Sequence, residues 1–416
     1  MYRPVAAIAF LALALHAPPA SALTLAEAME AAGSNTESAE LLRLAEDAAE
    51  ARSQVVLGEL LPNLRVSASS VRNSQSVELG GSAFVQLWDH QASLRLSIDV
   101  FRGTSIPTWV ASRTSEDATA ERTRWQSAGL RLATARAYLG ALTARQNVEA
   151  ARQSVSLREA SLEQVTVLEE AGYALAADIS RARYSLIEAS STLLEAGEQV
   201  EAQLETLRFL TGLDVERGDA LEAVAIPGYD GEQPTADMRA LAFDIEAAER
   251  LVRAQWLSFL PVLGLAGQYT IGAESLRAPD GTSWFVSFTA TWDVFDYGRY
   301  GRLAGARVDS AEADALLRQL ERERRRALDG ASRRVRVSAE LLALADEASA
   351  LAAETRRLEA DRFSGGDLTI LDLVSADIEL FRSQINRNRF ALERALAQIE
   401  LAYLEGALED DSWLSE

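Results

Sequence analysis

The chain has 416 residues, with 62 acidic against 41 basic side chains, two histidines and no cysteine, for a formal net charge of −21. The acidic balance disfavours nucleic-acid partners, and the lack of cysteine excludes disulfides, thiolate metal sites and a lipid anchor on an N-terminal cysteine. Because histidine is so scarce, we also expect no enzyme activity, no metal site and no cofactor.

The first predicted element is a cleavable signal peptide over residues 1–22. Arg3 precedes an apolar run from Val5 to Leu15, and small residues follow at 20–22. This run is shorter than the roughly 20 apolar residues of a membrane-spanning helix, so an uncleaved anchor is the less favoured alternative. Cleavage after residue 22 would start the mature chain at Leu23. It would leave His90 as the one histidine, which we interpret as a solvated side chain in a polar loop.

The remainder of the chain is an internal repeat. The triplet Asp-Val-Phe at 99–101 recurs at 293–295, and Gly172 recurs as Gly366 at the same offset of 194 residues. A constant offset over separate matches indicates two related halves. We assign residues 23–217 to the first repeat, 218–235 to a linker rich in glycine, proline and acid, and 236–416 to the second repeat.

Each half contains one predicted β-hairpin, about residues 63–101 in the first half and 262–296 in the second. Pro62 and Pro261 end the helical patterns that precede them. Apolar and polar side chains then alternate with the two-residue period of a strand, as in Ser93–Val100. Turn sequences at 80–81 and 279–281 separate the two strands of each pair.

A very long helix with heptad-like spacing follows each hairpin, from about Pro107 to Glu170 and from about Arg299 to Ser364. A helix of roughly 65 residues would be about 100 Å long. Glycine breaks then precede a second helix of about 40 residues in each half. Abundant alanine, with leucine at three- and four-residue spacing, predicts antiparallel coiled-coil packing.

The hairpins predict a barrel that several copies of the chain build together. A closed transmembrane barrel needs at least about eight strands, and three copies of four strands would supply about 12. Lipid would face the apolar side and water the polar side, which assigns Arg95, Asp99 and Asp293 to the lumen. Three tryptophans fall near strand ends, as aromatics at membrane interfaces do: Trp88, Trp284 and Trp292. The alternative is a soluble β-domain whose apolar face is covered by helix.

The sequence resembles the outer-membrane efflux protein family, the outer-membrane factors of tripartite efflux pumps and type I secretion systems. The resemblance is carried by the tandem repeat, by Leu-Pro-Asn-Leu at Leu61–Leu64 and by Ser-Ile-Asp-Val-Phe at Ser97–Phe101. In the second half, Trp292–Arg299, Arg362–Ala376 and Tyr403–Leu408 carry it. It covers essentially the whole mature chain, and its specificity lies in the order of these motifs.

This resemblance implies a mainly α-helical homotrimer with a β-barrel part, in which each subunit adds four strands to one transmembrane barrel of about 12 strands. Long antiparallel coiled-coil helices would form an α-barrel in the periplasm, below the outer membrane of a Gram-negative bacterium. The implied function is a passive exit duct for efflux or secretion. Its partners would be outer-membrane lipid, a periplasmic adaptor protein and an inner-membrane pump. The rival hypothesis is a soluble periplasmic coiled-coil adaptor or scaffold protein.

The resemblance also points to residues at the periplasmic tip, where paired helices turn. Family members carry aspartates there that narrow the channel, and the matching positions are Asp178 and Asp372. Further gate candidates are Asp377, with Ser375 and Arg181 at places where some members carry a second aspartate. The turns expected to contact the adaptor hold these residues: Gly172, Tyr173, Phe363, Gly365 and Gly366. The alternative is structural, with the aspartates as ordinary helix-surface charges and the glycines as helix C-caps.

Overall fold

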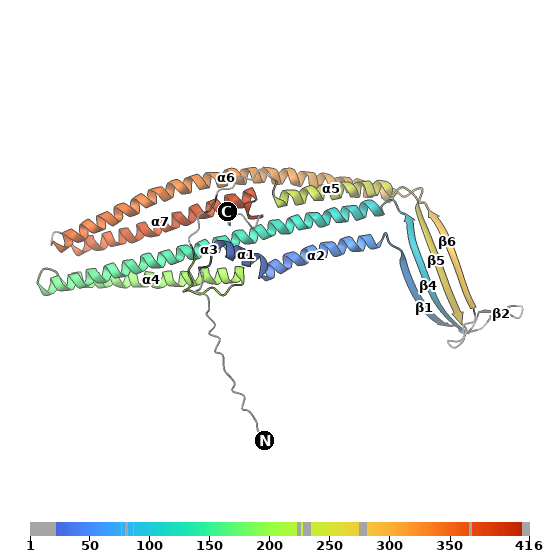
Figure 1. The fold of residues 1–416 in the computed structure, drawn as a ribbon, viewed down its shortest axis with the longest axis horizontal. Helices are drawn as coiled ribbons and strands as arrows, with labels where there is room; N and C mark the ends of the chain where they lie inside the picture. The colour runs from blue at the N-terminus through green and yellow to red at the C-terminus, as the bar shows by residue number, and fades with distance from the viewer. Residues whose placement is uncertain are drawn as a thin grey trace, which may run out of the picture.

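The computed structural model describes residues 22–75, 77–79, 82–85, 87–222, 226–227, 234–273, 281–365 and 368–409. Most of the predicted signal peptide and half of the linker (223–225 and 228–233) lie outside these residues, as do the turn at 80–81 and residues 279 and 280 of the other turn. Long helices run side by side, and the strands form a sheet that continues from one end of them at an incline (Figure 1).

One order of elements, a helix, two long strands and two helices, occurs in both halves; α1, β2 and β3 are additional elements of the first half. The helices are α1 (Leu25–Ser34), α2 (Glu37–Gly58), α3 (Ser105–Glu170), α4 (Ala176–Thr211), α5 (Ala236–Leu257), α6 (Tyr297–Ser364) and α7 (Ile370–Glu405), followed by a short 3-10 turn at Ala407–Glu409. The strands are β1 (Asn63–Arg72), β2 (Val77–Leu79), β3 (Ser82–Val85), β4 (Trp88–Phe101), β5 (Val262–Ala273) and β6 (Gly281–Thr291).

The internal repeat is visible in the helix ends. Helices α4 and α7 begin 194 residues apart (176 and 370) and end 194 residues apart (211 and 405). Both stop at a glycine with left-handed backbone, Gly212 at φ 66° and Gly406 at φ 90°. Glycine suits this position because a side chain with a Cβ is strained there. The repeated sequence motifs therefore correspond to repeated helix boundaries.

The long helices end where the sequence predicts, at Glu170 and Ser364, and each begins two residues before its predicted start. Strand β6 ends at Thr291, earlier than the predicted hairpin limit of 296. The segment after it turns toward α6: the Trp292 indole N–H donates to the Phe259 carbonyl (3.0 Å), and the Asp296 carboxylate accepts from the Gly298 amide (2.8 Å) and so caps α6.

Four strands form one antiparallel sheet in the order β1-β4-β5-β6. Residues that lie directly opposite each other point to the same face, and one such row is Val66, Leu94, Tyr269 and Trp284. One face is therefore apolar and the other mainly polar, as the alternation predicts. The apolar face is open, with Val66 76% and Trp284 72% exposed. This exposure contradicts the alternative of a β-domain covered by helix.

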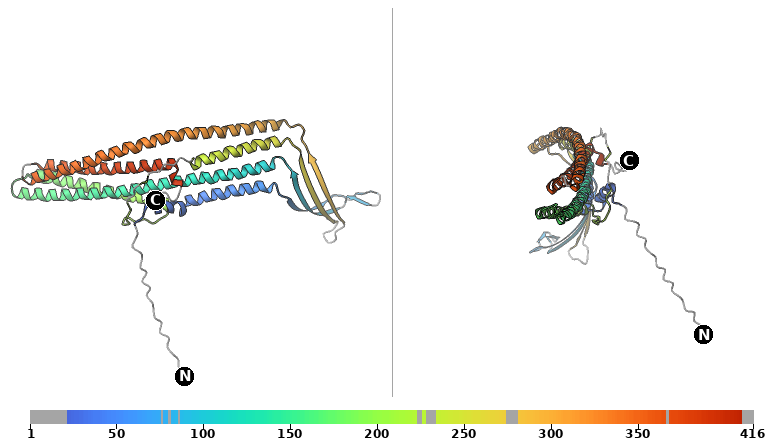
Figure 2. Two further views of the ribbon diagram at one scale, coloured as in Figure 1. Left: turned by 45° about the horizontal axis from the view of Figure 1, so that its top comes forward. Right: turned by 90° about the vertical axis from the view of Figure 1, so that its left-hand side faces the viewer.

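The helices form a curved row that continues the order of the strands (Figures 1 and 2). Helix α3 packs against α2 and α4 and also against α5 and α7, while α6 packs against α5 and α7. Small buried side chains such as Ala135, Ala141 and Ala144 allow this close approach. The ends of the row are α2 with α4 on one side and α6 on the other, just as β1 and β6 are the ends of the sheet.

The main hydrophobic core lies midway along the helices, where α1, α3, α4 and α7 meet. Buried Tyr138 of α3 donates its hydroxyl hydrogen to a backbone carbonyl, with the Leu23 oxygen 2.6 Å away, and accepts from the Glu222 amide (2.9 Å). Trp125 of α3 stacks on Tyr403 of α7 with ring centroids 4.3 Å apart. These contacts join the segments at Leu23 and Glu222 to helices α3 and α7 in one region.

Candidate functional site

The tip of the α3–α4 hairpin is a tight turn built around Gly172. The amide of Gly172 donates to the Glu169 carbonyl (2.9 Å) and that of Tyr173 to the Leu168 carbonyl (2.8 Å), a Schellman arrangement. Gly172 has φ 78°, which favours glycine. The turn leaves the Tyr173 ring 84% exposed at the end of the hairpin. Of the predicted contact residues, Gly172 and Tyr173 thus lie on an open surface.

The α6–α7 turn is built differently. Gly365 caps α6 with φ −77°, a conformation that any residue adopts, and Gly366 lies outside the described residues. Phe363 is buried (5% exposed) in a cluster with Val165, Ile370 and Leu373. The prediction that Phe363 offers a contact to a partner is therefore wrong in this structure. Its ring instead packs the end of α6 onto α3 and α7, because the three helices converge here.

Asp178 and Asp372 occupy the same position in their helices, the third residue of α4 and of α7. The Asp178 carboxylate accepts from the Leu175 amide (3.0 Å) and pairs with Arg181 (3.0 Å). The Asp372 carboxylate accepts from the Thr369 hydroxyl (2.6 Å) and the Thr369 amide (3.2 Å). These hydrogen bonds from Thr369 lower the pKa of Asp372. Both carboxylates cap helix N-termini, where negative charge is stabilised.

The remaining gate candidates divide between the surface and the interior. Arg181 is exposed, beside Asp178. Ser375 is also exposed, and its hydroxyl donates to the Leu371 carbonyl of its own helix (2.8 Å). Asp377 is 1% exposed, which contradicts the interpretation of it as an ordinary surface charge.

Asp377 lies in a buried polar contact that joins three helices. Its Oδ1 accepts from the Arg356 Nε of α6 (2.9 Å), while Oδ2 is buried without a hydrogen-bond partner among the described residues. Burial raises the pKa of Asp377, and this effect outweighs the lowering by Arg356. Arg158 of α3 is close enough to interact electrostatically with Asp377, and it also donates to the Ser185 carbonyl of α4 (2.7 Å).

The sequence analysis did not identify Arg158 or Arg356. A signal for Arg158 was present in its spacing: it falls on the buried stripe of α3 that includes Ala151, Ser161 and Val165. A charged residue at such a position needs a partner, because an unpaired buried charge is costly. Arg356 is partly exposed, with a side-chain exposure of 21%, and its sequence neighbours give no comparable signal.

The polar face of the sheet carries two of the three residues assigned to the lumen. Arg95 of β4 lies directly opposite Arg65 of β1, and Asp99 pairs with Arg102 (2.5 Å) on the same strand-to-helix segment. Asp293 is not on a strand: it follows the end of β6 and pairs with Arg299 of α6 (2.8 Å). The strand assignment of Asp293 is therefore wrong, because β6 ends two residues before it.

The three interface tryptophans lie at different heights. Trp88 is the first residue of β4, Trp284 the fourth of β6, and Trp292 follows the end of β6; all are exposed, at 41%, 72% and 60%. His90, predicted in a loop, is in β4 instead, where its ring stacks on Trp88. In the described part of the chain, no cluster of three or more His, Cys, Asp or Glu is arranged to hold a metal ion. Among these residues, no helix is both long enough and apolar enough to cross a membrane.

Both the sequence and the structure are similar to those of known outer-membrane proteins. The family described as outer membrane efflux protein matches residues 34–213 and 232–407. The structure is similar to the Campylobacter jejuni CmeC outer membrane channel, with a TM-score of 0.81 at 17% identity over 98% of this chain and 93% of CmeC. No curated protein matches the chain.

Two further outer-membrane proteins of known structure have the same fold. The outer membrane protein VceC from Vibrio cholerae has a TM-score of 0.78 at 17% identity, over 92% of this chain and 96% of VceC. The open state of the Neisseria gonorrhoeae MtrE outer membrane channel also has a TM-score of 0.78 at 17% identity, over 92% of this chain and 88% of MtrE. At this identity the solved structures establish the fold, with long helices and four strands that match those described above.

Proposed function

The chain belongs to the outer membrane efflux protein family, and from this premise we propose that three copies of it form one passive exit duct served by an inner-membrane pump and a periplasmic adaptor. As a member of this family, the protein is an outer-membrane efflux channel that extends into the periplasm. The number of subunits, the passive mechanism and the partners are the parts that we propose here.

The sheet is the single observation that supports the assembly most strongly. Its four strands have one apolar face, one mainly polar face and two end strands, β1 and β6. An unpaired strand edge is avoided in a bilayer, because each unsatisfied backbone group costs several kcal/mol there. Three copies joined edge to edge would give about 12 strands, enough to close with lipid outside and water inside.

The outer helices carry apolar stripes that suit the same assembly. On α6, Val337, Leu344, Leu351 and Leu358 recur every seven residues and are 49–63% exposed. On α4, Ile187 and Leu194 are also seven residues apart, and they are 65% and 71% exposed. Exposed leucines at heptad spacing form the seam of a coiled coil and need a partner helix. We infer that α6 of one copy packs against α4 of the next.

The two stripes lie at matching heights along the helices. Asp346 of α6 accepts from Arg387 of α7 (2.6 Å), and the Gln384 amide of α7 donates to Gln153 of α3 (3.0 Å). One turn further along α3, Arg158 reaches the Ser185 carbonyl of α4 (2.7 Å). These contacts connect α6 to α7, α7 to α3 and α3 to α4, and neighbouring helices in this series are antiparallel. Counting residues along them places Leu344 of α6 at about the same height as Leu194 of α4, and Leu351 of α6 at about the same height as Ile187 of α4. In a closed ring, residues at equal height meet.

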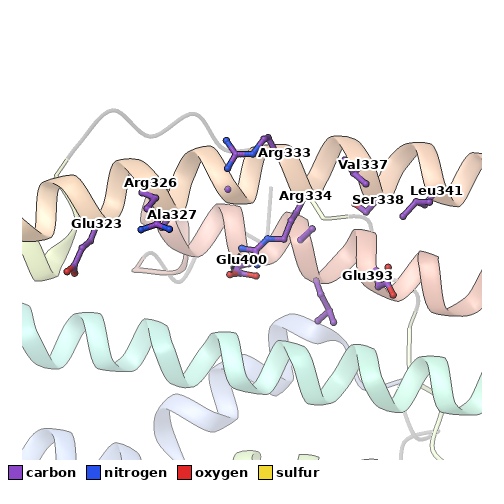
Figure 3. A pocket seen from close by; sticks show the side chains of 13 residues that line it. Glu323, Arg326, Ala327, Arg333, Arg334, Val337, Ser338, Leu341, Glu393 and Glu400 are labelled. Carbon is purple, nitrogen blue, oxygen red and sulfur yellow. Dashed lines mark hydrogen bonds and ion pairs between the residues drawn. The ribbon is translucent and has the colours of Figure 1, made fainter.

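Charge is complementary between the same two helices. Between residues 318 and 336, α6 carries eight arginines and three acids, whereas α4 carries four glutamates and no arginine between 195 and 205. A groove of about 1000 Å³ between α6 and α7 lies in this basic stretch, with Val337 and Leu341 along it and Arg326 and Arg333 at its edge (Figure 3). In the alignment of the two stripes, the α4 of a neighbouring copy would bring its glutamates level with the end of this basic stretch, near Arg334 and Arg336, and would complement their charge.

Single-channel recording in planar bilayers tests the proposal. The purified mature protein should give discrete, low, cation-selective conductance without nucleotide, because the protein is strongly acidic. The double variant Asp178→Asn with Asp372→Asn should conduct more, or lose block by polyvalent cations, if these carboxylates narrow the tip. Asparagine is chosen because it retains the hydrogen-bond acceptor that caps each helix. Absence of conductance, together with solubility without detergent, would instead favour a soluble periplasmic coiled-coil protein.

A further inference from the structure

The end of the sheet that lies farthest from the helices carries a basic and aromatic cluster on its apolar face. Arg72 of β1 lies directly opposite Trp88 of β4, and its guanidinium carbon is 5.4 Å from the centre of the indole ring. The His90 ring stacks on the same indole, with centroids 5.7 Å apart and an angle of 15° between the rings. A cation over an indole face is an attractive arrangement that fixes the arginine.

The cluster lies on the face that would meet lipid. The register between β1 and β4 is regular from Asn63 to Arg72, so Arg72 shares its face with Leu64 and Val66. Arg72 lies eight residues beyond Leu64, roughly 26 Å along the strand. At the strand tilt of an outer-membrane barrel this length corresponds to about 20 Å of height, and the apolar band of such a barrel is about 25 Å tall. Arg72 and Trp88 therefore stand near the outer limit of this band, toward the lipid headgroups.

The charges around Arg72 favour an anion. The nearest carboxylate on β4, Asp89, is on the opposite face, where it accepts a hydrogen bond from Gln91 (3.1 Å). The described neighbours that share the face of Arg72 are uncharged or aromatic: Ser70 on its own strand, and Trp88 and His90 on β4. A guanidinium presents a planar fork of donors that matches a phosphate group.

We propose that Arg72 and Trp88 form a binding site for the phosphate group of an anionic lipid in the outer leaflet. Arg72 donates hydrogen bonds to the phosphate, and Trp88 holds the guanidinium in place while His90 packs against the indole. The acyl chains of the lipid lie along the apolar row below, on Leu94 and Val66. This inference rests on the proposed function, because it requires the apolar face of the sheet to meet a bilayer.

Native mass spectrometry of the detergent-purified assembly tests the site, with lipid A carrying both phosphates and its dephosphorylated form as probes. Wild type should bind the phosphorylated lipid roughly tenfold more tightly than Arg72→Gln, the scale of losing one charge-assisted hydrogen bond. The matched control is Arg95→Gln, a lumen-side arginine in the same sheet, which should bind like wild type. Inorganic phosphate should not compete, because it lacks acyl chains.

Several outcomes would overturn the site. Equal binding by wild type and Arg72→Gln, equal binding of both lipids, or displacement by inorganic phosphate would each contradict a lipid-phosphate site. The same preparations are recorded in planar bilayers to separate this proposal from the channel itself. If they conduct but Arg72→Gln binds like wild type, the lipid site alone is wrong. If wild type neither inserts nor conducts, both proposals are wrong.

Discussion

Asp377 of α7 accepts a hydrogen bond from Arg356 of α6 at 2.9 Å, and its side chain is buried completely between the helices. Two opposing effects act on this carboxyl. Arg356 favours the charged form, whereas burial, with Oδ2 left unpartnered among the described residues, favours the neutral form. Burial is the larger effect, and the pKa of Asp377 is raised.

The raised pKa predicts how stability depends on pH. Because folding raises the pKa of Asp377, the folded protein binds this proton more tightly than the unfolded chain. The contribution of the group to stability is therefore fully present below the unfolded pKa and is lost as pH rises through the folded pKa. Asp377→Asn removes this dependence. The unfolding free energy of wild type minus that of the variant should therefore fall as the pH rises above about 4, the pKa of the carboxyl in the unfolded chain.

Thermal unfolding of both proteins in detergent, measured at a series of pH values above this one, checks the prediction. Glu354→Gln serves as the control, since Glu354 lies on the exposed side of α6 and pairs with Arg357 rather than with Asp377. If the unfolding free energy of wild type instead rises relative to that of Asp377→Asn as the pH rises, the prediction is wrong. That result would mean that the interaction with Arg356 outweighs burial and keeps Asp377 ionised.

The two tip glycines predict different responses to alanine. Gly172 has φ 78°, and a Cβ added to it would meet no atom within 4 Å. Gly172→Ala should therefore destabilise the protein only through strain of the left-handed backbone, by about 1–2 kcal/mol. Gly365 has φ −77°, and Gly365→Ala should change stability by less than about 0.5 kcal/mol. Hydrogen exchange of the amides that follow Leu168 should accelerate roughly tenfold in the first variant only. Equal exchange in the two variants would contradict the left-handed turn.

Arg65 and Arg95 face each other across β1 and β4 on the polar side of the sheet. If this side lines the lumen, removing one positive charge per subunit with Arg95→Gln should raise the cation-to-anion permeability ratio of the channel about twofold or more. Reversal potentials under a salt gradient measure this ratio. Arg72→Gln, on the other face, should leave it unchanged. A shift in Arg72→Gln without one in Arg95→Gln would reverse the assignment of the two faces.

Much of the fold could be predicted from local patterns. The two-residue alternation indicated which strand residues share a face, and the glycine breaks marked the ends of α3 and α6 at Glu170 and Ser364. The family resemblance is confirmed over residues 34–213 and 232–407. These features depend on neighbours in the sequence, which is why the sequence shows them.

The tip was harder to predict, because its contacts join distant residues. Arg356 and Asp377 are 21 residues apart, and Arg158 lies 219 residues before Asp377 (377 − 158). Phe363 stands next to a predicted turn, yet it is buried because α3 crosses it there. Leu373, Asp377 and Leu380 lie on one buried stripe of α7, a spacing that the interpretation of Asp377 as a surface charge did not take into account. That pattern identifies a buried acid without identifying its partner.

The apolar stripe of α6 predicts which substitutions disrupt the assembly of subunits. Leu344 and Leu351 are 63% and 61% exposed in the single chain, and burying each against a neighbouring copy would contribute about 1–2 kcal/mol. Leu344→Glu with Leu351→Glu should therefore shift the protein from trimer toward monomer, as sedimentation in detergent would measure. Ala350→Glu adds a charge to another side of the same helix and should leave the trimer intact, since this side lies away from both the stripe and α7. If the double variant remains trimeric, the subunits meet through a different surface of the helices, and the sheet edges alone would have to account for closure.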